Sequence, residues 1–167
     1  MKSKGFVVII IFLLISASGP LFAVEVGENA PAFVLTDIDK NYVFSKKLYG
    51  TGWVLVDFYA TWCENCNEEL PYIEELYDDF ADSGFQAMLL ATDDEGHSVV
   101  KPYFASAPTT LTVLIDKYKK AVGSFGVQAL PSLFLVDPDG KIAFKSVGYH
   151  EEDIVSLRAI LAEAYNE

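Results

Sequence analysis

Apolar residues recur along the chain in two spacings, one typical of buried strands and one typical of helices. Residues 54–59 and residues 85–91 are short, mostly apolar runs, as expected for strands buried on both faces of a sheet. The segment between them, residues 68–82, has helical periodicity. Its apolar positions are Leu70, Ile73, either Leu76 or Tyr77, and Phe80. Gly84 is a natural helix stop, so the pattern predicts strand, helix and strand in that order.

Two predicted hairpins flank this unit. Residues 33–35 and 42–44 are apolar runs separated by a polar stretch, which indicates an N-terminal β-hairpin. Residues 133–137 and 141–147 are joined by a connection containing Pro-Asp-Gly, a tight-turn signal that predicts an antiparallel pair. The remaining predicted elements are helices over residues 97–105, 118–125 and 151–165 and a strand over residues 112–116. This order predicts an α/β fold with a central mixed sheet and helices on both faces.

The first 23 residues differ from the rest of the chain. Two lysines precede an unbroken apolar run over residues 6–15, and small residues follow it, which is the layout of a secretory signal peptide. An uncleaved N-terminal membrane anchor is the alternative, because residues 5–24 carry no charge and about 20 apolar residues can span a bilayer. In either case residues 24–167 form one domain outside the cytoplasm, in the periplasm or cell envelope, soluble or N-terminally anchored.

Composition and charge restrict the function classes. The chain has 167 residues, enough for one well-buried domain, and its 51% hydrophobic content argues against disorder. It has 24 acidic and 12 basic residues, so its formal net charge is -12. Binding to nucleic acid and adsorption to anionic lipid both need clustered Lys and Arg, so this balance disfavours them. We interpret the charge as a soluble acidic surface.

The only cysteines are Cys63 and Cys66. A bridge across so short a loop adds little stability through chain entropy, so the pair is better explained by chemistry than by architecture. A zinc site would need two further ligands, and His97 and His150 are isolated in the sequence, so we expect no metal. Covalent haem attachment would need histidine directly after the pair, where Asn67 stands.

The position of the pair suggests redox chemistry. The strand over residues 54–59 leads into Cys63 and then into a helix, and a cysteine at a helix N-terminus is stabilised as the nucleophilic thiolate. We expect Cys63 to be partly exposed and to attack. We expect Cys66, one helical turn later, to be more buried and to resolve the mixed disulfide. Such chemistry requires no bound organic cofactor.

Residues 53–66, which include Trp62 and both cysteines, resemble the active-site segment of the thioredoxin superfamily. The leader, the N-terminal hairpin, residues 69–71 and residues 126–132 are similar to its exported TlpA and ResA branch. The resemblance covers residues 26–165. It implies a thioredoxin-like fold and thiol–disulfide oxidoreductase activity on protein disulfides. It also implies a membrane thiol carrier as electron donor and a role in cytochrome c maturation.

The resemblance also implies roles for single residues. Pro131 matches a proline that is cis and packs beside the disulfide, where Leu130 and Pro131 present a backbone edge to the substrate and Trp62 adds contact surface. Without the resemblance, Pro131 could simply start a strand and Trp62 could simply be a packing residue. Asp57 matches a buried acid that exchanges a proton with Cys66, and burial in an apolar strand should raise its pKa.

Glu64 and Asn65 stand between the cysteines, where many relatives have proline or glycine. A carboxylate beside Cys63 disfavours its thiolate, so we expect Glu64 and Asn65 to tune the pair toward a reductant.

Three other functions on the same fold are alternatives. A peroxidase would need Thr or Ser at Ala60 and Pro at Val56, so that pattern is missing. A non-catalytic binding module would not need both cysteines together with Asp57 and Pro131. An oxidative folding catalyst usually has a helical insertion for which this chain has no room.

Overall fold

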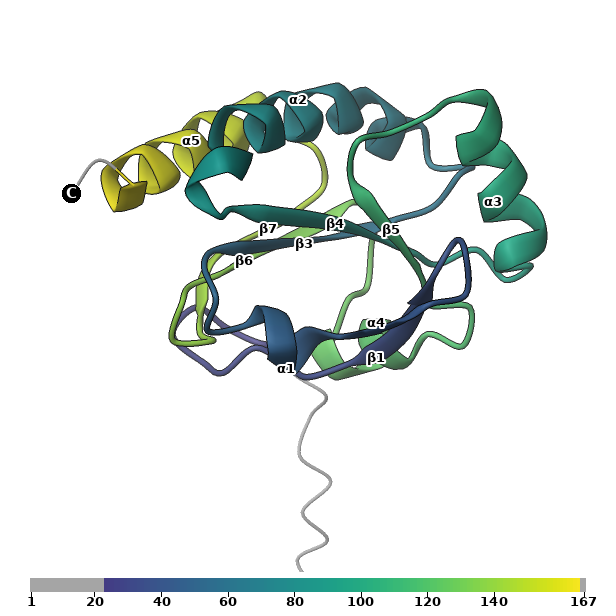
Figure 1. The fold of residues 1–167 in the computed structure, drawn as a ribbon, viewed down its shortest axis with the longest axis horizontal. Helices are drawn as coiled ribbons and strands as arrows, with labels where there is room; N and C mark the ends of the chain where they lie inside the picture. Colours follow the sequence, from purple (N-terminus) through teal and green to yellow (C-terminus); the bar gives the residue numbers. More distant parts are fainter. Residues whose placement is uncertain (1–22, 166–167) are drawn as a thin grey trace, which may run out of the picture.

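A seven-stranded sheet forms the centre of the protein in the computed structural model, which describes residues 23–165 (Figure 1). The strands are β1 (Val34–Asp37), β2 (Tyr42–Phe44), β3 (Val54–Tyr59), β4 (Gln86–Ala91), β5 (Thr112–Ile115), β6 (Ser132–Val136) and β7 (Ile142–Val147). The helices are α1 (Ser45–Leu48), α2 (Glu64–Phe80), the 3-10 turn η1 (Ala81–Ser83), α3 (His97–Ser106), α4 (Lys120–Phe125) and α5 (Glu151–Tyr165). Helices α2, α3 and α5 lie on one face of the sheet and α1 and α4 on the other, so the predicted layers are confirmed.

The strand order is β2-β1-β5-β4-β3-β6-β7. Strand β3 is central, parallel to β4 and antiparallel to β6, so the sheet is mixed as predicted. Both hairpins form: β1 pairs antiparallel with β2, and β6 with β7. The N-terminal hairpin extends the sheet by pairing β1 with β5.

The central strand divides its side chains between two cores. Side chains alternate along a strand, so Val54, Val56 and Phe58 enter the core beneath α4. Leu55 and Tyr59 enter the core beneath α2, α3 and α5. Asp57 lies between Leu55 and Tyr59 in this alternation, which directs its carboxyl group toward the α2 side. That side also contains Cys66.

Several element bounds differ from those expected. Helix α2 begins at Glu64 rather than at residue 68, because Cys63 caps it. Helix α4 begins at Lys120 rather than at residue 118, because Lys119 has a left-handed backbone (φ 56°) that interrupts the helix. The short helix α1, directly after β2, was not predicted, since its four residues have no periodicity to read.

Within the described residues, none of the helices has the length and apolar character needed to cross a membrane. The predicted leader, residues 1–23, lies outside the described part except for its last residue.

Candidate active site

Cys63 and Cys66 form a disulfide at the start of α2, with an S–S length of 2.02 Å. Cys63 is the N-cap residue, and its Sγ accepts a hydrogen bond of 3.2 Å from the backbone N–H of Cys66. The first N–H groups of a helix have no partner within the helix and carry partial positive charge. This position therefore stabilises negative charge that develops on the Cys63 sulfur.

The two cysteines differ in exposure. Cys63 has 7% of its surface exposed, and Cys66 has none. Cys63 is therefore the less buried of the two, as expected, but it is more buried than the partly exposed position that the sequence predicted.

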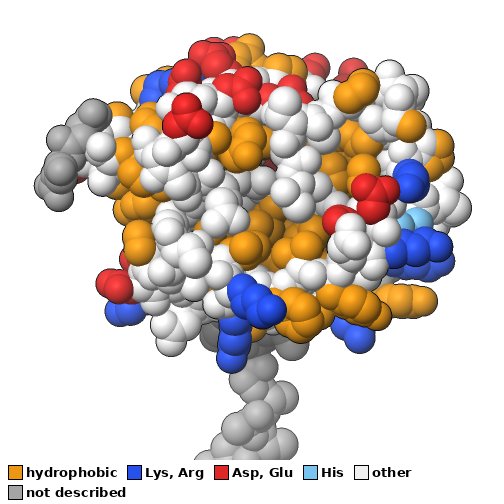
Figure 2. Space-filling view, in the orientation of Figure 1, with side chains coloured by type: hydrophobic (Ala, Val, Ile, Leu, Met, Phe, Trp, Pro, Cys, Tyr) orange, Lys and Arg blue, Asp and Glu red, His pale blue; other side chains and the backbone are white. Residues whose placement is uncertain are grey.

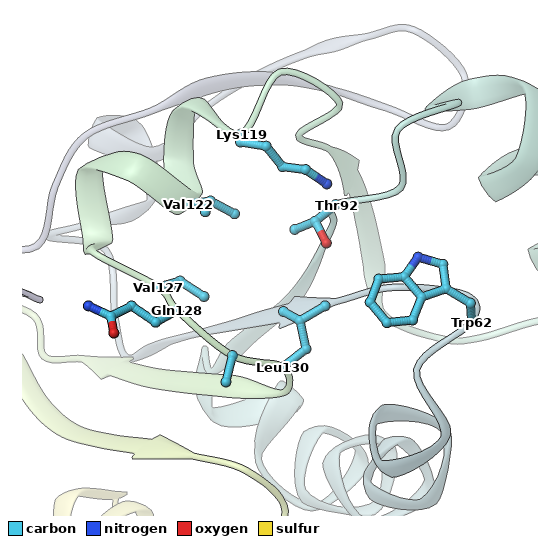
Figure 3. Close-up of a pocket in the computed structure, with 8 residues that line it drawn as sticks. Trp62, Thr92, Lys119, Val122, Val127, Gln128 and Leu130 are labelled. Carbon is cyan, nitrogen blue, oxygen red and sulfur yellow. The ribbon is translucent and has the colours of Figure 1, made fainter.

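An apolar groove of about 180 Å³ is lined by Trp62, the residue directly before Cys63 (Figure 3). Trp62, directly before Cys63, is 71% exposed and forms one wall. Leu130, Val127 and Val122 form the other. Trp62 and Leu130 are far apart in the sequence, and the fold brings them to one groove.

Pro131 lies where β6 begins. The Leu130–Pro131 peptide bond is cis, as the resemblance implied. The next residue, Ser132, pairs with Phe58 near the end of β3, and the chain continues from β3 to the cysteines. The proline loop and the cysteine loop therefore meet at the same end of the sheet.

Asp57 is buried, with 1% of its surface exposed. Within residues 23–165, neither carboxylate oxygen has a hydrogen-bond partner. Burial disfavours the charged form, so it raises the pKa of Asp57 well above the ordinary carboxylate range. This is the environment that the sequence predicted.

A second buried acid, Glu69, was not predicted as a functional residue. It has no exposed surface, and among the described residues its carboxylate oxygens also have no hydrogen-bond partner. Burial raises the pKa of Glu69, and the charges of Asp57 and Asp153 raise it further. The signal was present in the sequence, since Glu69 stands three residues after Cys66 and four before Ile73, on the buried face of α2.

Glu64 and Asn65 are both exposed in the first turn of α2. Water therefore screens the charge of Glu64, and its effect on the Cys63 thiolate should be small.

A buried hydrogen-bond network supports the loop before Cys63, and sequence reasoning missed it. The fully buried Asp93 carboxylate accepts hydrogen bonds from the Thr61 backbone N–H and hydroxyl. The Asn67 side-chain oxygen accepts from the hydroxyls of Tyr59 and Tyr103, the latter at 2.8 Å. These contacts connect the loop to β4, α2 and α3.

Sequence comparison shows the family. A profile of the AhpC/TSA family matches residues 26–145. The thiol-disulfide oxidoreductase ResA of Bacillus anthracis is 37% identical over 124 residues, which cover 74% of this chain and 70% of that protein. ResA of Bacillus subtilis (strain 168) is 29% identical over 136 residues, covering 80% and 73% of the two chains.

Structure comparison agrees. A putative thiol:disulfide interchange protein DsbE from Chlorobium tepidum superimposes with a TM-score of 0.79 at 26% identity, covering 86% of this chain and 99% of that one. A putative protein disulfide isomerase from Bacteroides thetaiotaomicron gives a TM-score of 0.78 at 28% identity, covering 86% and 92%. The fold is therefore thioredoxin-like, as the sequence resemblance implied. Together with the capped Cys63–Cys66 pair, the comparisons establish that this chain belongs to the AhpC/TSA family and is a thiol–disulfide oxidoreductase similar to ResA.

Proposed function

We propose that this chain works outside the cytoplasm as a reductant of protein disulfides, with Cys63 as the attacking residue and Cys66 as the resolving residue. The observation that carries the proposal is the asymmetry of the pair. Cys63 keeps 7% of its surface exposed and follows Trp62, which lines an apolar groove, whereas Cys66 is fully buried. A groove of this kind suits an unfolded or extended substrate segment, which can place its disulfide against Cys63.

The reaction follows from this geometry. The Cys63 thiolate attacks one sulfur of the substrate disulfide, forms a mixed disulfide and releases the first substrate thiolate. The Cys66 thiolate then attacks the Cys63 sulfur, which forms the Cys63–Cys66 bond and releases the second substrate thiolate. The two electrons of the dithiol pass to the substrate, and its two protons end on the substrate thiols.

The buried acids supply proton control at Cys66. Asp57 and Glu69 lie on the same side of the sheet as Cys66, and burial raises the pKa of each. A carboxyl group whose pKa lies nearer the working pH exchanges protons more effectively with a thiol. We assign Asp57, whose pKa is raised by burial, as the group that takes the Cys66 proton. Glu69 is a second buried acid whose own pKa is raised further by the charge of Asp57.

The substrate contacts are Trp62, Leu130 and Pro131. Trp62 and Leu130 supply apolar surface on the two sides of the groove. Pro131 has no backbone N–H, its carbonyl accepts from the Gly148 N–H, and the Ala129 carbonyl accepts from the Ser132 hydroxyl. The Leu130 carbonyl, which lies between them, is therefore the one we assign to the substrate chain. The backbone of the loop thereby contacts any sequence, while the groove favours apolar side chains.

The proposed direction is reduction of the substrate. Negative charge near the pair disfavours the Cys63 thiolate, which destabilises the reduced form and makes the dithiol a better electron donor. Glu64 contributes a little of this charge because it is exposed, and Asn65 beside it contributes none. When Asp57 and Glu69 are ionised, they disfavour the thiolate more strongly than Glu64 does, because these two acids are buried.

The test is turnover. With dithiothreitol as electron source, the protein should accelerate the reduction of insulin disulfides, followed by insulin precipitation, and the Cys63→Ala variant should not. In equilibrium with glutathione, the pair should have a potential near those of reductants, below about -200 mV. A potential near -120 mV, that of a strong oxidant, would contradict the proposed direction.

A peroxidase assay discriminates against the main alternative. The side chains at Ala60 and Val56 are fully buried and apolar, so neither provides the hydroxyl that a peroxidase places before its cysteine. Consumption of hydrogen peroxide without insulin reduction would replace the present proposal with peroxidase function. Absence of both activities would favour a binding module.

The cellular setting of the proposal comes from the predicted leader and from the resemblance to ResA-type proteins. On that basis the electron donor is a membrane thiol carrier, and the substrates include oxidised cytochrome c precursors. Trapping experiments in the native envelope test both: a membrane dithiol protein should be captured by the oxidised chain, and a precursor disulfide by the reduced one.

A further inference from the structure

The charge of this protein is divided between its two helical layers. Helix α2 has seven acidic and no basic side chains, and α5 has four acidic side chains and one arginine. Helices α1 and α4 on the opposite face have lysines and no acids. Figure 2 shows acidic side chains gathered along the upper edge and most Lys and Arg side chains toward the lower half. The net charge of -12 therefore does not describe the helices α1 and α4.

The β2 edge of the sheet and the loop after β5 expose aromatic residues. Tyr118 is 78% exposed, Tyr42 72% and Phe44 42%. Two adjoining hollows connect them, because Val34 lines both the one between Tyr42 and Tyr118 and the one beside Phe44. We call this surface the lysine–aromatic patch. It consists of Tyr42, Phe44 and Tyr118 together with Lys46, Lys47, Lys117 and Lys120.

The patch lysines are available to an external anion. Within residues 23–165, none of the four forms an ion pair, whereas Lys101, Lys119, Lys145 and Arg158 all do. Lys47 lies over the Phe44 ring, 4.9 Å from its centroid. The buried acid Asp116 lines the same hollow as Lys117 and Lys120, but it accepts hydrogen bonds from the N–H groups of Lys120 and Val122 and is 1% exposed.

The acids of the hairpin tip have partners of their own. Asp39 forms an ion pair with Lys101. Asp37 accepts hydrogen bonds from Asn41 and from the backbone N–H of Asp39. Burial alone would raise the pKa of Asp37, but these hydrogen bonds lower it below its usual range. Asp37 and Asp39 therefore do not pair with the patch lysines.

The chain also enters the folded body on this face. The backbone N–H of Val24 donates to the carbonyl of Phe125 at the end of α4, at 3.1 Å. A stretch of 22 residues precedes the described part of the chain. If that stretch is retained in a bilayer, it brings the α4 side of the protein to the lipid surface.

We propose that the lysine–aromatic patch is a docking surface for a bilayer of anionic phospholipids. Tyrosine and phenylalanine side chains are favoured at the interface between water and lipid, and lysines near the surface attract the lipid phosphates. The average charge argues against such adsorption. However, charges are screened beyond about 8–10 Å at physiological salt, so the acidic layer across the sheet has little influence at the patch.

Docking would place the redox groove beside the lipid. Lys119 and Val122 line the groove, and the adjacent Lys120 belongs to the patch. A docked chain would thus present Cys63 close to the bilayer surface.

Vesicle binding by the chain beginning at Val24 tests the proposal without the leader. This chain retains every described helix and strand and the contacts of residues 24–30 with the body. It should sediment with vesicles of phosphatidylglycerol and phosphatidylcholine at low salt, and not with phosphatidylcholine vesicles alone. The variant Lys46→Gln/Lys47→Gln/Lys117→Gln/Lys120→Gln should bind about 100-fold less tightly, given the attraction of each lysine to an anionic surface.

The matched control is Lys40→Gln/Lys101→Gln/Lys141→Gln/Lys145→Gln, which removes the same charge outside the patch and should retain nearly full binding. Equal loss in both variants would mean that net charge alone matters and would overturn the proposal. So would failure of the unaltered chain to bind, or a concentration-dependent dimer, seen by sedimentation velocity, in place of vesicle binding. If the patch variant does not fold, two other measurements test the proposal. The Tyr42→Ser/Tyr118→Ser variant should bind vesicles less tightly, and binding by the unaltered chain should weaken as the salt concentration rises.

Discussion

The two sides of the Cys63–Cys66 bond are built differently, although only two residues separate the sulfurs. The Cys63 side is open, with an exposed tryptophan, an apolar groove and an exposed glutamate in the next position. The Cys66 side is closed, and two carboxyl groups without hydrogen-bond partners among the described residues are buried on that side of the sheet.

The difference separates two tasks that disulfide exchange requires. Substrate selection needs contact surface and access, which water also enters. Control of a proton needs burial, because only a dry environment shifts a carboxyl pKa far from its ordinary value. Placing the sulfurs one helical turn apart at a helix N-terminus allows one pair to have both environments.

The largest effect should come from removing the exposed sulfur. The Cys63→Ser variant should lose insulin reduction to the background rate, because Cys66 is fully buried and cannot attack a protein disulfide directly. The measurement is turnover with dithiothreitol in excess. Thermal unfolding under reducing conditions serves as control, since serine should leave the fold unchanged. Residual activity above about a tenth would contradict the assigned roles.

Removing the buried acids should have the next largest effect. We expect Asp57→Asn to lower turnover about 10- to 100-fold near pH 7, within the usual range for a proton-transfer group. Glu69→Gln should act less, because burial and not the charge of Glu69 raises the Asp57 pKa. The pH–rate profile separates loss of a proton-transfer group from a structural effect, because a packing defect would lower the rate equally at all pH values.

The same acids should make stability depend on pH. Burial raises the pKa of Asp57 and Glu69, so the folded protein holds more protons than the unfolded chain above about pH 4, and stability falls as the pH rises. Asp57→Asn should therefore raise the free energy of unfolding at pH 8 by about 2 kcal/mol, with little gain at pH 4. Urea unfolding at the two pH values measures this, and a loss of stability at pH 8 would contradict the account.

Changes to the open side should alter binding more than chemistry. Trp62→Ala or Leu130→Ala should raise KM for a protein disulfide about three- to tenfold with kcat nearly unchanged, as expected for lost apolar contact. Tyr72→Ala is a matched control, because Tyr72 is an exposed aromatic residue of α2 that does not line the groove. An equal rise in KM in all three variants would contradict a role of the groove in substrate binding.

The smallest effect should come from Glu64. Because its side chain is exposed, Glu64→Gln should make the potential more oxidising by no more than about 10 mV, which corresponds to a free energy of about 0.5 kcal/mol. Asn65→Asp is the converse change and should shift the potential in the opposite direction. A shift of about 50 mV for either would mean that this position is not screened by water.

The sequence predicted most of this fold because its patterns are local. The apolar run of β3 and the helical periodicity of α5 can each be recognised in a short stretch of sequence, and the predicted bounds of both elements agree with the structure. Helix α4 was predicted to begin too early, because the left-handed backbone at Lys119 depends on contacts and not on residue type.

Features that depend on the meeting of distant segments were harder to find. Asp57 was found because an acid in an apolar strand is conspicuous. Glu69 was missed because α2 contains many acids, and only the three-residue spacing from Cys66 marks it as buried. The Asp93 network and the uneven distribution of charge appear only when α3, α4 and the loops are placed in space.

Trapping of the mixed disulfide tests the division of roles most directly. The reduced Cys66→Ala variant and the reduced Cys63→Ala variant are each incubated with insulin, and the products are separated without reductant. We predict an adduct through Cys63 in the Cys66→Ala variant, released by dithiothreitol, and almost none in the Cys63→Ala variant. Equal trapping through Cys66 in the Cys63→Ala variant would contradict this prediction.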